Sequence, residues 1–197
     1  MRRVVLLVLL ALALPMAAFA SSGVDFTNSG GTLSGSDAGL TLTGSVLAAV
    51  NGYHGMGLIT GNLGTVEFTT GALISGSTDM GGTFAAGGTF TVTGNGSNGL
   101  PNGVIFSGTF DSPVTWTLVT LANGTHNYVL SGTLAGNMGG AGVTVQLTIN
   151  TGKGFFNGST MISSGDTNVV VPEPGTLGLL GTGLVGLAGM LRRKFIA

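Results

Sequence analysis

Apolar and polar residues alternate with a period of two along much of the interior of the chain. The clearest runs are residues 89–93 and 143–150, in which Phe, Val, Leu or Ile alternates with Thr, Gln or Asn. This period, with many β-branched residues, is typical of strands that bury one face. No segment between residues 21 and 170 keeps a period of 3.6 residues, so we expect little helix there.

The alternation is most regular between residues 103 and 150, where it predicts a meander of about four antiparallel strands. Residues 111–113 and 122–125 carry the Asp, Pro, Asn and Gly residues that are common in turns, so they are predicted to connect the strands. The side chains predicted to face inward are those of Val104, Phe106 and Phe110, followed by Val114, Trp116 and Leu118. Thr115 and Thr117 are predicted to face solvent.

The preceding part of the chain is less regular. Residues 39–50, 64–70 and 82–84 are predicted strands, although residues 45–50 are apolar enough to form a helical turn instead. Many short strands with Gly-rich connections predict an all-β fold, either an antiparallel sandwich or a flattened barrel. A β-solenoid is the alternative, but the Gly-Thr pairs that recur along the chain are unequally spaced.

Residues 1–20 have the pattern of a secretory signal peptide. Arg2 and Arg3 precede an apolar run at residues 4–14, and Ala18 and Ala20 occupy the small-residue positions of a cleavage site. The pattern predicts export through the secretion translocon with cleavage after Ala20. A twin-arginine signal and an uncleaved anchor are the alternatives.

A second apolar segment lies near the C-terminal end. Residues 175–191 carry no charge, and as a helix they would extend about 25 Å, near the lower limit for a hydrocarbon core of about 30 Å. The residues before this segment are Pro172, Glu173 and Pro174, and those after it are Arg192, Arg193 and Lys194. The basic cluster is predicted to stay cytoplasmic, which places the rest of the protein on the outer side of the membrane.

The order of a Pro-Glu-Pro tripeptide, a short Gly-rich hydrophobic helix and a basic tail resembles the PEP-CTERM sorting signal of Gram-negative bacteria. The resemblance covers residues 171–197. It implies that exosortase, a membrane protease-transpeptidase, recognises residues 172–174, and that the basic cluster stops transfer. An ordinary tail anchor with a chance tripeptide is the alternative.

Removing both ends leaves a predicted exported domain, residues 21–170, of unusual composition. It contains one cation, Lys153, and six acids, which gives a formal charge of −5, whereas the whole chain has −1. Nucleic acid is therefore not an expected partner, because its phosphates require clustered Lys and Arg. The chain has no cysteine, so packing and ladder hydrogen bonds must stabilise the domain.

No catalytic or metal-binding constellation is apparent, so we expect a protein that is not an enzyme and needs no cofactor or metal. His54 and His126 are expected at the surface, and Glu67 is the one acid centrally placed in a clear strand. Acids also occur in the predicted polar loops 34–37, 75–79 and 164–166, where turn capping is a simpler explanation than calcium binding.

Three functions are compatible with these features. The first is a non-catalytic protein of the cell surface or extracellular matrix, linked to exopolysaccharide or biofilm as the resemblance implies; it would pass through the inner membrane to the cell envelope or the medium. The second is a carbohydrate-binding module that uses Tyr53, Trp116, Tyr128 or an exposed Phe to stack on sugar rings. The third is a hydrolase whose site assembles only in the folded protein.

Overall fold

The computed structural model describes residues 23–138 and 143–170, and in these residues the chain is almost entirely β-structure. A single 3-10 turn, η1 (Tyr53–Gly55), accompanies the strands. The strands are β1 (Gly23–Ser29), β2 (Thr32–Ser36), β3 (Gly39–Asn51), β4 (Ile59–Thr60), β5 (Gly64–Thr69), β6 (Leu73–Ser77), β7 (Gly81–Phe84), β8 (Gly87–Asn95), β9 (Asn102–Phe110), β10 (Val114–Thr120), β11 (His126–Gly136), β12 (Val143–Asn150), β13 (Ser159–Met161) and β14 (Ser164–Val170).

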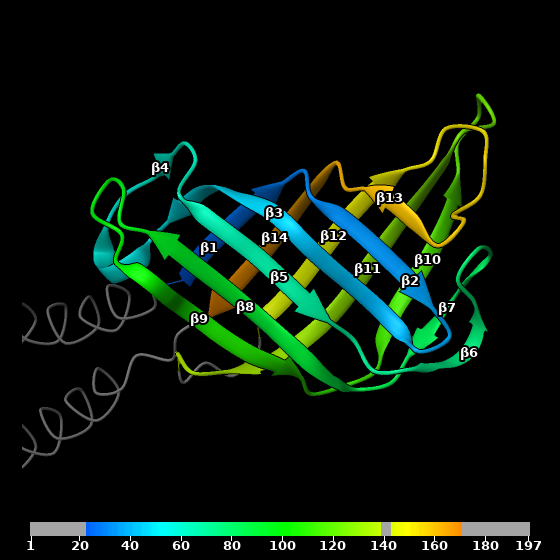
Figure 1. Ribbon diagram of the computed structural model, residues 1–197, viewed down its shortest axis with the longest axis horizontal. Helices are drawn as coiled ribbons and strands as arrows, with labels where there is room; N and C mark the ends of the chain where they lie inside the picture. The colour runs from blue at the N-terminus through cyan, green and yellow to red at the C-terminus, as the bar shows by residue number, and fades with distance from the viewer. Residues whose placement is uncertain (1–22, 139–142, 171–197) are drawn as a thin grey trace, which may run out of the picture. The chain divides into compact units, whose positions relative to one another are not determined.

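Eight of these strands close into an antiparallel barrel (Figure 1). Their order around the wall is β12–β14–β1–β3–β5–β8–β9–β11, and pairing of β11 with β12 completes the ring. The all-β prediction is confirmed, and of the predicted architectures the barrel is the one observed. The predicted signal helix and the predicted membrane helix, residues 175–191, lie outside the described residues. Among the described residues, no helix has the length and apolarity needed to cross a bilayer.

The remaining strands extend the barrel wall. On one side, β7 pairs with β10 and β6 pairs with β7, so β10, β7 and β6 form a three-stranded flap. On the other, β2 pairs with the first part of β3 and β13 pairs with β2. The short β4 pairs with the end of β3.

The predicted meander between residues 103 and 150 is only partly correct. Its four strands exist, but β9 and β10 do not form a hairpin: both pair with β11, β9 at Phe110↔Leu134 and β10 from Thr115↔Ser131 onward. They therefore follow one another along the same edge of β11, and the 111–113 connection offsets the chain without reversing it. Pro113 interrupts the ladder at this point because it has no N–H to donate.

Register shifts in β9 and β3 explain where the expected alternation fails. In β9, Val92↔Phe106 is followed by Thr93↔Val104, so Ile105 is an extra residue. As a result Ile105 and Phe106 are both buried, whereas Val104, which was predicted to face inward, is 59% exposed. In β3, register shifts change the inward face twice, which is why residues 46–50 are a continuous apolar run and still part of a strand.

Four phenylalanine rings pack against one another in the core of the barrel. Phe90 contacts the other three, with its ring centroid 6.0 Å from that of Phe68, 6.1 Å from Phe106 and 6.4 Å from Phe110. All four side chains are at most 2% exposed. The inward orientation predicted for Phe106 and Phe110 is confirmed. Because the chain has no cysteine, packing of these rings stabilises the core without a disulfide.

A second aromatic cluster lies under the flap and joins separate parts of the chain. The rings of Trp116 and Tyr128 stack with centroids 5.0 Å apart, and Phe156 packs edge-on against both. The Trp116 indole N–H donates to the Thr78 carbonyl at 2.8 Å, and the Tyr128 hydroxyl donates to the Asp79 carbonyl at 2.5 Å. The cluster therefore fixes the tip of the β6–β7 hairpin against β10 and β11.

Candidate functional site: a polar groove on the barrel wall

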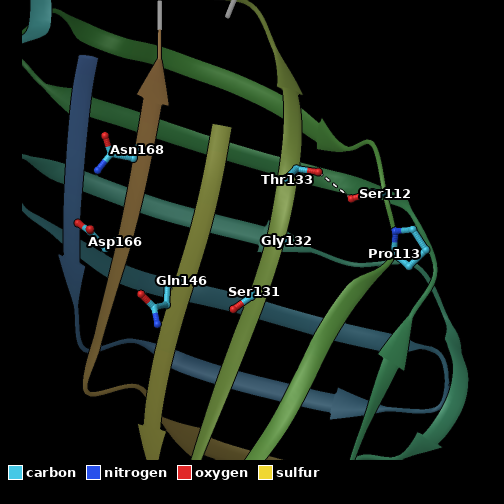
Figure 2. A pocket seen from close by; sticks show the side chains of 8 residues that line it. All are labelled: Ser112, Pro113, Ser131, Gly132, Thr133, Gln146, Asp166 and Asn168. Carbon is cyan, nitrogen blue, oxygen red and sulfur yellow. Dashed lines mark hydrogen bonds between the residues drawn. The ribbon is translucent and has the colours of Figure 1, made fainter. Parts of the chain in front are cut away.

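The candidate site is an open groove on the outer face of the barrel, with a volume of about 620 Å³ (Figure 2). Its lining comes from β14, β12, β11 and the 111–113 connection: Asp166, Asn168, Gln146, Ser131, Gly132, Thr133, Ser112 and Pro113. The volume falls within the roughly 300–1,000 Å³ range of ligand pockets in proteins. The groove forms where β9 ends and β10 begins, because the edge of β11 is partly uncovered there.

Strand register explains why the polar groups gather on one face. Gln146 pairs with Ser131 on one side and with Asp166 on the other, and Asp166 pairs with Thr27. Paired residues on neighbouring strands point to the same face, so Ser131, Gln146, Asp166 and Thr27 form one row across four strands. Asn168 lies two residues beyond Asp166 on β14 and therefore points to the same outer face.

Hydrogen bonds fix the rim of the groove beside the 111–113 connection. The hydroxyls of Ser112 and Thr133 lie 2.7 Å apart and share a hydrogen bond, which Figure 2 shows as a dashed line. The Thr133 hydroxyl also donates to the Asp111 carboxylate, and the Asp111 N–H donates to the Thr133 carbonyl at 3.2 Å. These contacts hold the connection against β11.

Gly132 lines the groove, and a side chain at this position would point into the core. A Cβ atom at this position would lie 2.9 Å from Cδ1 of Phe110 and 3.2 Å from Cγ2 of Val114, both of which are buried. The backbone of β11 therefore approaches the core more closely than a side chain would allow.

Two carboxyl groups meet at the β1–β14 seam beside the groove. The carboxyl groups of Asp25 and Asp166 lie near each other on the paired strands β1 and β14, and the Thr27 hydroxyl donates to Asp166 at 3.4 Å. The Oδ1 atom of Asp25 is buried and has no hydrogen-bond partner among the described residues. Burial and the nearby Asp166 carboxyl raise the pKa of Asp25 from 3.8 to about 6.

This carboxyl pair should make the free energy of unfolding depend on pH. Because the pKa of Asp25 is higher in the folded protein, the folded state binds the proton more tightly, and stability should fall as pH rises from about 3.8 through about 6. Replacing Asp25 with Asn should flatten this slope. At pH 8 it should raise the melting temperature by about 2–4 °C, because solvent screening limits the gain to about 1 kcal/mol. Thermal melts of both proteins between pH 3.5 and 8 test this; parallel curves would contradict it.

The structure places the individual residues considered in the sequence analysis as follows. His54 is exposed, and His126 is half-buried, with its Nδ1 3.1 Å from the Thr120 hydroxyl and its ring stacked on Phe155 at 4.4 Å. Glu67 is exposed at the middle of β5 and accepts the Gly44 N–H at 3.4 Å.

The predicted acidic loops are corrected in one case. Asp37 and Asp79 lie in turns, and the Ser36 and Ser77 hydroxyls there accept backbone N–H groups at 3.2 Å. The Ser77 hydroxyl also donates to the Asp79 carboxylate, which lowers the pKa of that group. Asp166, however, lies within β14 and not in a loop. No group of three His, Cys, Asp or Glu side chains that could hold a metal occurs among the described residues.

The aromatic residues proposed to stack on sugars do not form a surface platform. Tyr53 is 8% exposed, Trp116 1% and Tyr128 0%. Among the described residues the exposed phenylalanine is Phe155, which lies against His126 and outside the groove. Any carbohydrate recognition by the groove must therefore depend on hydrogen bonds.

The fold and the groove together define an all-β barrel domain whose described outer wall is rich in hydroxyls and carries few charges, among them the Asp25–Asp166 pair and Glu67. The flank that follows this domain belongs to a known class: residues 170–194 match the family model of the PEP-CTERM protein-sorting motif. This confirms the resemblance found in the sequence, and the rest of the chain is unassigned. Neither a curated protein nor a solved structure matches the chain.

The sorting motif implies an exported protein that exosortase processes, and PEP-CTERM proteins are exported and sorted to the cell surface. The motif residues Pro172, Glu173 and Pro174, the basic cluster Arg192, Arg193 and Lys194, and the cleavage residues Ala18 and Ala20 lie outside the described residues. Their individual roles stay predictions.

Sequence reasoning missed both the groove and the carboxyl pair. Asp25 and Asp166 are separated by 141 positions, and only the pairing of the first and last barrel strands brings them together. The alternation of Val24 and Phe26 with Asp25 and Thr27 was a usable signal that 23–29 is a strand, whereas 164–170, with three consecutive polar residues, has no such alternation. The alternation could not show that the two segments are neighbours.

Proposed function

We propose that this protein is a non-catalytic structural component of the cell surface or extracellular matrix, linked to exopolysaccharide or biofilm. The observation that carries the proposal is the sorting motif at residues 170–194. The protein would be anchored briefly in the inner membrane, processed by exosortase, and then released or attached to the cell envelope.

The barrel domain supports this role in two ways. Its outward-facing residues on β5 and β8 are mainly threonines, such as Thr65 and Thr93, which pair across the strands and can exchange hydrogen bonds with a hydrated matrix. Its first and last strands pair at Gly23↔Val170, so the closed fold ends two residues before Pro172. Processing near the motif would thus release a complete barrel.

The carboxyl pair gives little support to the hydrolase alternative. In a glycosidase both carboxyl groups face the sugar, one on each side of the bond that is cleaved. Only Asp166 lines the groove. If the two acted as a catalytic pair, Asp25→Asn would abolish function; we expect this variant to accumulate in the matrix and to support matrix formation as the unmodified protein does.

The sorting step can be tested by mass spectrometry of the mature protein. In cells with exosortase we expect a C-terminus near residues 172–174, and in cells without it a chain that continues through Arg192 and Arg193. Replacing Pro172, Glu173 and Pro174 together with alanine should reduce processing at least tenfold. Replacing Thr176, Leu177 and Gly178 with alanine is the matched control and should leave processing unchanged. An intact C-terminus in both kinds of cell would overturn the sorting assignment.

A carbohydrate-binding function is the second candidate, and the groove is the observation that favours it. It would not replace the surface role, because a matrix protein can act by holding polysaccharide.

A further inference from the structure

The groove has a lining that selects for one class of ligand. Its side chains supply three hydroxyls, two carboxamides and one carboxylate, and the apolar side chain in the lining is that of Pro113. No Lys, Arg or His lines it, so it offers nothing to neutralise a phosphate, sulfate or uronate, and Asp166 would repel such groups. Apolar ligands are equally unsuited, because they would desolvate the amides and hydroxyls without replacing their hydrogen bonds.

The same groups match a ligand rich in hydroxyls. Each hydroxyl and carboxamide can both donate and accept a hydrogen bond, and the carboxylate accepts only. A sugar hydroxyl also both donates and accepts, so adjacent hydroxyls of a glycan can bond to a carboxamide through two atoms. A polyamine could bind to Asp166 but would leave the hydroxyls and carboxamides without matching acceptors.

Part of the lining is fixed and part is free to bind. The Ser112 and Thr133 hydroxyls bond to each other, which holds the rim in place. By contrast, the side chains of Ser131, Gln146 and Asn168 are exposed and make no hydrogen bond among the described residues. When a ligand binds, the rim loses little further side-chain entropy because it is already held in place. The entropy cost is therefore limited mainly to the three side chains that are free to bind.

The spacing of the groups favours a chain over a single small molecule. Ser131, Gln146 and Asp166 lie on three successive strands, about 4.8 Å apart, in one row along the groove (Figure 2). We propose that this groove binds a stretch of neutral polysaccharide by hydrogen bonds alone, without aromatic stacking. The proposal deepens the proposed function, since it gives the matrix protein a direct contact with exopolysaccharide.

The test uses the full chain, purified in a detergent without a sugar headgroup, on an array of neutral glucans, mannans, galactans and xylans together with polyuronates. We expect binding to at least one neutral glycan and weaker binding to polyuronates. In the double variant Ser131→Ala/Gln146→Ala, affinity should fall at least tenfold, equal to about 1.4 kcal/mol. The matched control is Thr65→Ala/Thr93→Ala, a cross-strand pair on the outer face of β5 and β8, which should bind as the unmodified chain does.

Three results would overturn the proposal: no binding to any neutral glycan, equal loss in the groove and control variants, or preferential binding of polyuronates. Competition by spermidine alone, with no glycan binding, would show that the groove is a cation site instead. Circular dichroism and thermal melts of both double variants confirm that they are folded. Failure of the proposed surface role would be seen separately, as an unprocessed C-terminus in cells whose purified protein still binds the glycan.

Discussion

Replacing Phe90 with alanine is expected to lower the free energy of unfolding by about 3–5 kcal/mol, the usual loss when a buried aromatic ring is removed. The effect should be large because Phe90 lies among Phe68, Phe106 and Phe110, so its removal leaves a cavity bordered by three rings from two other strands, β5 and β9. With no disulfide to limit unfolding, the melting temperature should fall by roughly 10 °C or more. Urea denaturation followed by circular dichroism measures this.

The control for Phe90 is the same substitution at Phe155. This ring is 47% exposed and its aromatic contact is with His126 at 4.4 Å, so Phe155→Ala should cost about 1 kcal/mol or less. Equal losses for the two variants would mean that the phenylalanine cluster does not form the core of the barrel.

Replacing Tyr128 with phenylalanine is expected to lower the free energy of unfolding by about 1–3 kcal/mol. The variant keeps the ring that stacks on Trp116 and loses the hydroxyl, which donates to the Asp79 carbonyl and accepts the Phe156 N–H at 3.0 Å. Removing one atom therefore leaves two backbone groups without partners. Amide hydrogen exchange should also become faster at residues 78–80 and 156, because the hairpin tip and the 155–156 segment lose their common anchor.

Tyr53 provides the matched control for this change. Its ring is buried, but within the described part of the chain its hydroxyl makes no hydrogen bond. Tyr53→Phe should therefore change stability by no more than about 0.5 kcal/mol. If Tyr128→Phe were equally mild, the hydroxyl would not be what attaches the flap to the barrel.

The sequence predicted individual strands better than their partners. The alternation in 114–118 correctly placed Val114 and Trp116 inward and Thr115 and Thr117 outward. It failed at Val104, because a bulge inserts one residue and reverses the faces, and nothing in a two-residue period signals a bulge. The hairpin expected between β9 and β10 failed for another reason: turn residues identify a connection, but they do not fix its direction.

The candidate site was less predictable than the fold. Asp166 was assigned to a loop because Ser-Gly-Asp resembles a turn, yet pairing of β14 with β1 and β12 makes it a strand residue. Tyr128 and Trp116 were possible sugar platforms, and the hairpin tip at Thr78 and Asp79 covers them. In both cases a contact distant in sequence overrode a local pattern.

The sequence by itself determined the all-β class and the sorting motif, because strand periodicity and a contiguous recognition motif are local properties that short-range chemistry defines. It also determined that packing must stabilise the domain, since a chain without cysteine cannot form disulfides. Only the tertiary structure decided that the first and last strands close a barrel, that Asp25 meets Asp166, and that a polar groove opens beside β11. The physical reason is that strand pairing joins residues far apart in the chain, and the energy of that pairing depends on the whole core.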